Sequence, residues 1–238
     1  METIKSVANR RIKERASLHL KKNRDASHLF LVEGAHMVEA ARQAGVLKEV
    51  YALPRDHIKN AIPCTEVVLS KLSGLTSSGA PVGVCEKPVF PDVRFERVLI
   101  LERVQDPGNV GTLIRSACAF GVDAVLLSEG CADPYAFKSL QSTQGAIFEI
   151  PVLQENPVAW LQKHPEVTSY AACLRRDSQP LRAVEAPQSW ALCIGNEGQG
   201  LSEELIEACD HRVEIEMKRF ESLNAAVAGS ICLWHFSS

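Results

Sequence analysis

Residues 101–121 of this chain are LERVQDPGNVGTLIRSACAFG, and they predict a strand, a tight turn and a helix in direct succession. The apolar start fits the end of a strand, and Asp106 and Pro107 break it. In the remainder, apolar residues recur at the i, i+3, i+4, i+7 and i+8 positions that form one helix face, with Arg115 off that face. A strand that runs directly into a helix is the repeating unit of an α/β fold.

The same alternation continues toward the C-terminus. Apolar runs predict strands at 98–104, 124–127, 147–152, 170–174, 191–194 and 212–215. Helical spacing predicts helices at 110–120, 135–141, 157–163, 203–209 and from 223 onward. Because these strands are apolar along their whole length, we expect a parallel sheet with helices on both faces. Ligands bind such sheets at the carboxyl ends of the strands.

The beginning of the chain predicts a smaller α/β unit. Its predicted helices are 6–21 and 35–44, and its predicted strands are 30–33, 50–53, 66–69 and 82–85. Pro88 and Pro91 then break the pattern, as in a linker. With 238 residues the chain exceeds the usual domain of about 100–150 residues. We therefore predict two domains, residues 1–90 and residues 91–238.

The composition excludes several classes of protein. Hydrophobic residues make up 46% and charged residues 23%, as in ordinary globular proteins. No apolar run reaches the roughly 18 residues of a membrane span, and no apolar segment follows the charged N-terminus as in a signal peptide, so we expect a cytoplasmic protein without membrane contact. The eight cysteines are scattered without a C-x-x-C pair, which predicts reduced side chains and no metal site.

The charge is unevenly distributed. The net charge is −3, but the first 24 residues carry eight Lys and Arg against two Glu, which is +6. Such a cluster either is a solvated helix face or contacts the phosphates of a nucleic acid, and its density favours the second interpretation. The candidate RNA contacts are Arg10, Arg11, Lys13, Lys21, Lys22 and Arg24.

Two later segments also follow predicted strands in a way that suits a ligand site. Residues 195–202, GNEGQGLS, place three glycines where backbone can approach a ligand closely. Their order differs from the G-x-G-x-x-G of dinucleotide-binding folds, which disfavours a dinucleotide-dependent enzyme. Residues 221–228, ESLNAAVA, predict a helix start with Ser222 as its N-cap. No His or Lys lies near Ser222 in a way that would make it a hydrolase nucleophile.

In order along the chain, the motifs D-P-x-N-x-G-x-x-x-R-x-A-x-x-F-G, G-N-E-G-x-G-L-S and E-S-L-N-x-x-V-A resemble the three motifs of the SpoU/TrmH-type (SPOUT) RNA 2′-O-ribose methyltransferases. The resemblance spans residues 98–234. The N-terminal part, with its basic helix and the segment FLVEG at 30–34, is similar to the L30e-like RNA-binding domain of family members that modify ribosomal RNA.

The resemblance implies a methyl donor, an assembly and a topology. The donor is S-adenosylmethionine, the assembly is a homodimer with sites at the subunit interface, and the topology is a C-terminal trefoil knot, which is a rare exception to the rules of chain connection. By motif, the catalytic residues are Asn109, Arg115, Glu197, Ser222 and Asn224, and the cofactor-binding residues are Gly195, Ile215 and Leu223.

The role of Arg115 follows from its chemistry. A guanidinium stays protonated because its pKa lies above about 12. We therefore expect Arg115 to hold the phosphate of the target nucleotide and to stabilise the developing alkoxide, rather than to act as the base that members of the family are proposed to use.

The choice of substrate leaves alternatives open. The additional N-terminal domain favours ribosomal RNA over transfer RNA as the substrate of a 2′-O-methyltransferase. The other alternative is a catalytically inactive RNA-binding or ribosome-assembly relative, because Glu216 stands where the family usually has proline and the loop 215–222 is one residue shorter than usual. The presence of all five catalytic candidates favours an enzyme.

Overall fold

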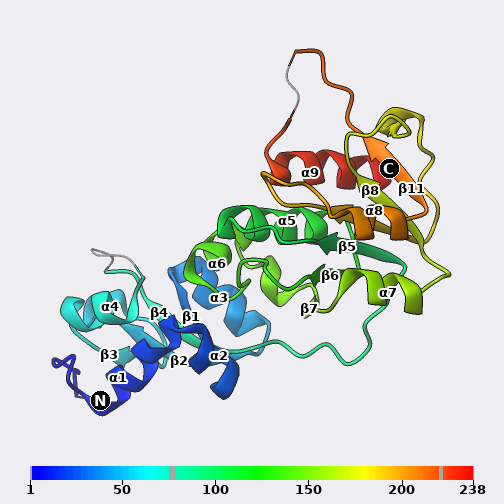
Figure 1. Ribbon diagram of the computed structural model, residues 1–238. Coiled ribbons are helices and arrows are strands. Elements are labelled where there is room, and N and C mark those ends of the chain that lie inside the picture. The colour runs from blue at the N-terminus through cyan, green and yellow to red at the C-terminus, as the bar shows by residue number, and fades with distance from the viewer. Residues whose placement is uncertain (1, 75–78, 220–221, 238) are drawn as a thin grey trace.

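The computed structural model describes residues 2–74, 79–219 and 222–237, and it contains two β-sheets from successive parts of the chain (Figure 1). The first sheet has the strand order β1-β4-β2-β3, and the second has the order β7-β6-β5-β10-β8-β11-β9. The second sheet is parallel throughout its pairs. The predicted α/β class with a parallel sheet is confirmed, while the C-terminal knot stays a prediction.

The N-terminal part differs from its prediction in two helices. Its elements are α1 (Arg10–Ala16), α2 (Lys21–Ser27), β1 (Leu29–Glu33), α3 (Ala35–Gln43), β2 (Leu47–Ala52), β3 (Ile62–Pro63), α4 (Glu66–Leu72) and β4 (Val82–Glu86). The predicted basic helix at 6–21 is divided, because Leu20 is extended between α1 and α2. The predicted strand at 66–69 is wrong: α4 buries Val68, Leu69 and Leu72 on one helix face.

The C-terminal part follows its prediction more closely. Its elements are β5 (Arg97–Leu101), α5 (Pro107–Ala119), β6 (Ala124–Leu127), α6 (Phe137–Thr143), β7 (Val152–Gln154), α7 (Pro157–Lys163), β8 (Thr168–Ala172), β9 (Gln179–Pro180), β10 (Trp190–Ile194), α8 (Glu203–Ala208), β11 (His211–Glu214) and α9 (Ala225–Phe236). The predicted strand at 147–152 is mostly wrong. Its apolar residues Ile147 and Ile150 are buried ahead of the short β7.

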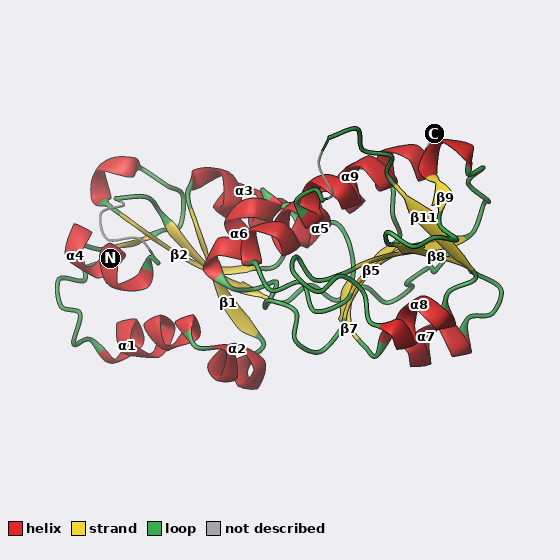
Figure 2. Cartoon of the chain, turned by 45° about the horizontal axis from the view of Figure 1, so that its top comes forward, coloured by secondary structure: helices red, strands yellow, loops and turns green. Residues whose placement is uncertain are grey.

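Helices cover both faces of the large sheet. Alternate residues of β5 point to opposite faces, so Leu99 and Leu101 pack with α5 and α9, whereas Val98 and Ile100 pack with α7 and α8. Figure 2 shows α3, α6, α5 and α9 following one another along one side of the molecule. The row is tight: a side chain at Gly111 of α5 would place its Cβ 2.2 Å from the carbonyl oxygen of Ser139 in α6.

Candidate functional site

A cavity of about 440 Å³ lies at the carboxyl ends of β8, β10 and β11. This is the edge at which parallel sheets bind ligands, and the volume falls within the roughly 300–1,000 Å³ of small-molecule and cofactor sites. The three predicted cofactor residues, Gly195, Ile215 and Leu223, all line it, together with the predicted catalytic residues Glu197 and Ser222.

The glycine-rich loop after β10 is a closed turn. Asn196 and Gly200 exchange backbone hydrogen bonds, and Asn196 Oδ1 accepts hydrogen bonds from the backbone N–H groups of residues 198 and 199. A Cβ on Gly195 would lie 2.3 Å from the backbone of Gly200 and Leu201. The closed turn therefore requires glycine at position 195.

A hydrogen-bond chain connects the three sequence motifs. Asn109 Nδ2 donates to Glu197 Oε1 at 2.8 Å, and Asn224 Nδ2 donates to Asn109 Oδ1 at 3.0 Å. Glu197 also accepts hydrogen bonds from the backbone N–H groups of Gln105 and Asp106. The carboxylate thereby fastens the glycine-rich loop to the turn after β5.

These contacts set the charge of Glu197. Partial burial favours the neutral acid and raises its pKa, but the hydrogen bonds from Asn109 and from backbone N–H groups outweigh burial and leave the pKa of Glu197 below its usual value. Glu197 is therefore an anion at neutral pH. A carboxylate whose oxygens accept these hydrogen bonds is well suited to hold the loop.

Asp106 and Asn224 cap the helices that meet at the site. Asp106 caps α5 by accepting a hydrogen bond from the Asn109 N–H at 3.0 Å. The ammonium of Lys138, 2.8 Å from Asp106, lowers the pKa of Asp106 together with that backbone hydrogen bond. Asn224 caps α9 through the N–H groups of residues 226 and 227. The predicted N-cap at Ser222 is thus wrong, and the exposed Ser222 lines the cavity instead.

Arg115 lies apart from the cavity. It is exposed on α5, and within the described residues it forms no ion pair. One turn earlier on the same helix, Thr112 lines a second hollow, which Asn109, Asn224 and apolar residues of α9 also line. The structure therefore brings Asn109, Glu197 and Asn224 together and leaves Arg115 near the neighbouring hollow.

The arrangement of this site matches a known protein family. Residues 96–234, which contain the cavity and the hydrogen-bond chain, match the profile of the SpoU rRNA Methylase family. The chain belongs to the SpoU rRNA methylase family. Residues 9–85 match the MRM3-like substrate binding domain. The resemblance inferred from the three motifs is confirmed.

Full-length relatives of this SpoU family chain are known. The 23S rRNA (guanosine(2553)-2'-O)-methyltransferase RlmP of Bacillus subtilis is 36% identical over 99% of each chain. The crystal structure of an rRNA methyltransferase from Sinorhizobium meliloti has a TM-score of 0.87 at 26% identity and covers 99% of this chain and 96% of its own. The AdoMet-bound structure of the rRNA methyltransferase from that organism has a TM-score of 0.86 at 26% identity, with coverage of 99% and 97%.

The candidate RNA contacts of this SpoU family chain are exposed with one exception. Arg10, Arg11, Lys13, Lys21 and Lys22 lie at the surface. Three of them pair with carboxylates: Arg10 with Glu14, Arg11 with Glu49 and Lys21 with Asp25. Arg24 does not fit the predicted role of an RNA contact, because it is only 5% exposed and its guanidinium binds Asp133 of the C-terminal part. Its charge is already neutralised within the protein.

Several cavity residues were missed by sequence reasoning. Cys173, Leu174 and Arg175, which follow β8, line the cavity, and so do Met217 and Cys232. The predicted strand at 170–174 was a signal for Arg175 alone, since residues that follow a strand of a parallel sheet face the ligand edge. The observed strand ends at Ala172, so Cys173 and Leu174 were placed inside the strand. Glu221, which begins the third motif, lies outside the described residues. Within the described residues there is no group of three or more side chains that would hold a metal ion.

In the part of the chain that the structure describes, none of the helices combines the length and the apolar character of a bilayer span.

Proposed function

We propose that this protein is an S-adenosylmethionine-dependent RNA 2′-O-ribose methyltransferase that acts on ribosomal RNA. The observation that carries the proposal is the cavity at the ligand edge of the sheet and the hydrogen bonds at its rim. Glu197, in the glycine-rich loop of the cavity, accepts a hydrogen bond from Asn109, and Asn109 accepts one from Asn224. Membership of the SpoU rRNA methylase family and a relative named as a 23S rRNA 2'-O-methyltransferase support the reaction and the substrate.

The chemistry of the cavity fits S-adenosylmethionine. Apolar side chains such as Leu201, Ile215 and Leu223 suit the adenine ring, and the exposed backbone of the glycine-rich loop suits polar groups of the ligand. Two thiols also line the cavity, and burial raises the pKa of both, that of Cys232 to about 12. Because thiols are poor nucleophiles when protonated, neither competes for the methyl group. When bound, the cofactor supplies a sulfonium methyl group to the attacking ribose oxygen.

The residues of this chain then align the RNA with that methyl group. Glu197 and Asn109 fix the glycine-rich loop, and Asn224 fixes the start of α9 beside Ser222. Alignment of two reactants in a fixed geometry is a large source of rate enhancement. We propose that Arg115 binds the target phosphate and stabilises the negative charge on the 2′-oxygen as its proton passes to water.

We propose that Arg115 acts across a homodimer. On α9, Val227 and Ile231 are 48% and 37% exposed, four residues apart on one face, and Trp234 continues the row. Exposed apolar patches of this kind mark interaction sites. Arg115 lies one helical turn from the hollow that this face lines, so a second copy docked there would lie beside Arg115, and we propose that Arg115 then serves the partner's cavity. The expected dimer and the remote position of Arg115 are thereby explained together.

The N-terminal part is proposed to bind RNA. Residues 1–90 include the match to the MRM3-like substrate binding domain and five exposed cations of the candidate set. Carboxylate partners on the surface are weakly held, so phosphates can replace them. The additional domain favours ribosomal over transfer RNA, and the cytoplasm is the proposed location.

A calorimetric titration with S-adenosylmethionine separates the enzyme from an inactive RNA-binding relative. We expect micromolar binding to the wild type and equal binding to Arg115→Ala, because Arg115 does not line the cavity of its own chain and its proposed ligand is the phosphate of the RNA. Glu216, which stands where the family usually has proline, pairs with Arg182 and is not among the residues that line the cavity. This position supports an active enzyme over an inactive relative. Lack of binding at millimolar ligand would contradict the proposal.

A further inference from the structure

A buried ion pair joins the two parts of the chain. Arg24 of α2 places Nη2 2.5 Å from Asp133 Oδ2, and the side chains are only 6% and 14% exposed. Arg24 Nη1 also donates hydrogen bonds to the backbone carbonyls of Leu18 and His19. The guanidinium is therefore fixed by its own domain while it holds the carboxylate of the other.

One further hydrogen bond joins the two parts, between the His36 ring of α3 and the Gln144 carbonyl at 3.1 Å, and the other contacts between them are less directional. The ring of Phe30 lies 4.8 Å from that of Tyr135, and the ammonium of Lys87 lies 4.9 Å above the same ring. Apolar contacts tolerate sliding and rotation, because the hydrophobic effect depends on area rather than on direction. A charged hydrogen bond from a guanidinium whose Nη1 N–H groups bind backbone carbonyls requires a defined geometry. Arg24 and Asp133 thus form the charged and most deeply buried directional contact that limits the angle between the parts.

Asp133 is connected to the candidate site through α6 and α5. Ser139 of α6 donates a hydrogen bond to the Asp133 carbonyl at 2.7 Å, and Lys138 of α6 pairs with Asp106, which caps α5. The close approach of α5 and α6 at Gly111 prevents the two helices from moving independently. The first turn of α5 carries Asn109, which binds Glu197 of the cavity. The position of Asp133 relative to the cavity is therefore fixed.

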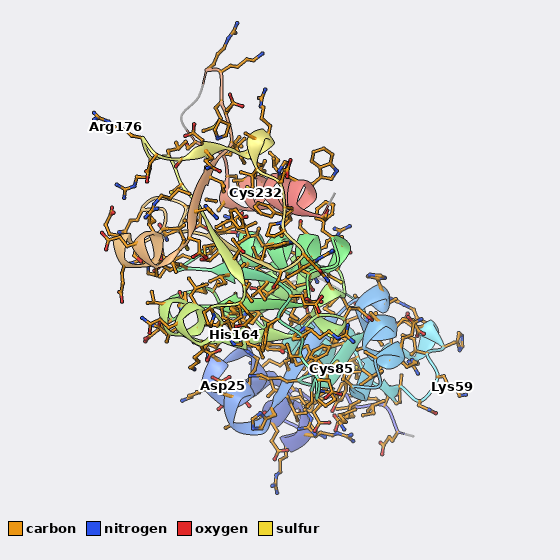
Figure 3. The ribbon with its side chains drawn as sticks, turned by 90° about the vertical axis from the view of Figure 1, so that its right-hand side faces the viewer. Asp25, Lys59, Cys85, His164, Arg176 and Cys232 are labelled. Carbon is orange, nitrogen blue, oxygen red and sulfur yellow. The ribbon has the colours of Figure 1, made fainter. Side chains whose placement is uncertain are left out.

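The two ends that this contact relates are far apart. Figure 3 shows Lys59 of the N-terminal part and Arg176 of the C-terminal part at opposite ends of the molecule, and in Figure 1 α2, which carries Arg24, lies closer to the second sheet than α1 and α4 do. Cys232 lines the cavity. Because the RNA-binding surface and the cavity lie on different sides of this contact (Figure 1), a change of angle at the ion pair shifts RNA bound to the N-terminal part relative to the cavity.

We propose that Arg24 and Asp133 are positioning residues that set the orientation of the RNA-binding domain and thereby select which nucleotide enters the cavity. This inference rests on the proposed function. In this proposal Arg24 influences which nucleotide is methylated although it does not itself contact the RNA.

The test compares Arg24→Met and Asp133→Asn with Glu129→Gln, which removes an exposed carboxylate shortly before Asp133. RNA affinity, kcat and the position of the methyl group are measured on ribosomal RNA. Independently of catalysis, spin labels on unnatural amino acids at Lys59 and Arg176, on opposite ends of the molecule, report the distance between the two parts by pulsed electron paramagnetic resonance (Figure 3).

We expect both variants to retain RNA affinity, to lose about 10- to 100-fold in kcat, to methylate neighbouring nucleotides and to show a broadened label distance, while Glu129→Gln behaves as wild type. Two results would overturn the proposal. One is weakened RNA binding with unchanged kcat, which makes Arg24 an RNA contact. The other is a lowered unfolding temperature with unchanged kcat and methylation site, which makes the pair merely stabilising.

Failure of the proposed function looks different. If the wild type transfers no methyl group to any RNA, the proposed reaction is wrong and nucleotide selection falls with it. The label distances still decide the structural part, since unchanged distances in both variants contradict an orienting role for the ion pair.

Discussion

Asn224 and Asn109 are 115 positions apart in the chain, yet Asn224 Nδ2 donates a hydrogen bond to Asn109 Oδ1 at 3.0 Å. Asn109 passes the connection on to Glu197 through its own Nδ2. One amide side chain thus uses its acceptor toward the third motif and its donor toward the second. Neither a carboxylate nor an aliphatic side chain at this position serves both.

Asn109→Asp tests that dual role. The substitution keeps the acceptor for Asn224, removes the donor and places a second carboxylate against Glu197, so like-charge repulsion displaces the glycine-rich loop. We expect about a 10- to 100-fold loss of kcat, measured as methyl transfer to ribosomal RNA. The control is Asn156→Asp at the N-cap of α7, on the other face of the sheet, where an acid caps equally well. Wild-type activity of Asn109→Asp would contradict the role of the hydrogen-bond chain.

Gly195→Ala tests the closed loop. The new Cβ would lie 2.3 Å from the backbone of Gly200 and Leu201, so the loop must open. We expect at least a loss of about tenfold in S-adenosylmethionine affinity by calorimetry. Gly198→Ala is the matched control in the same loop, because among the described residues its Cβ would meet only Asn196 Oδ1, at an ordinary 3.6 Å. Equal binding by both variants would show that the loop shape does not govern the cofactor.

The acid stability of the N-terminal part depends on Glu49. Although burial opposes it, hydrogen bonds from Arg15, Tyr51 and Arg11 lower the pKa of Glu49 to about 2. A lowered folded-state pKa means that the carboxylate stabilises the fold above pH 4.5, its ordinary value, and that this contribution is lost as pH falls toward 2. We expect Glu49→Gln to lower the free energy of unfolding by about 2 kcal/mol at pH 7.

Urea denaturation at a series of pH values checks this expectation. The difference between Glu49→Gln and the wild type should shrink below pH 4.5 and vanish near pH 2. A difference that stays constant down to pH 2 would mean that the substitution acts through packing rather than through charge.

Ile231→Asp tests the proposed dimer. Ile231 lies in the exposed apolar row of α9, and a charge buried in an interface without a partner is costly. We expect the variant to sediment as a monomer and to lose methyl transfer, because Arg115 no longer reaches a partner's cavity. Val89→Asp is the control, since Val89 is 86% exposed but lies in the predicted linker, away from α9. A monomeric wild type with full activity would overturn the dimer.

The C-terminal elements could be predicted because their signals are local. The strand at Trp190–Ile194 is a continuous apolar run, and Asp106 and Ser202 cap helices as their sequence positions indicate. The helix Glu66–Leu72 could not be distinguished from a strand, because a short apolar run lacks a period. Its assignment depends on packing against distant residues.

In the candidate site, too, residues with a local sequence signal could be predicted and those that depend on distant partners could not. Gly195, Glu197 and Asn109 were found because each belongs to a motif that follows a strand, and the structure joins them. The burial of Arg24 depends on Asp133, 109 positions later, and no local pattern announces such a partner. A cluster of cations in sequence is therefore weaker evidence for an RNA surface than the paired and unpaired charges of the folded chain.

The most direct test of the central claim is methyl transfer resolved by position on the nucleotide. Ribosomal RNA is incubated with the wild-type protein and isotopically labelled S-adenosylmethionine, digested to nucleosides and analysed by mass spectrometry, with Arg115→Ala as the comparison. We predict label on the ribose 2′-oxygen of a single nucleotide with the wild type and none with Arg115→Ala. Label on a base, or no label although the cofactor binds, would contradict the account.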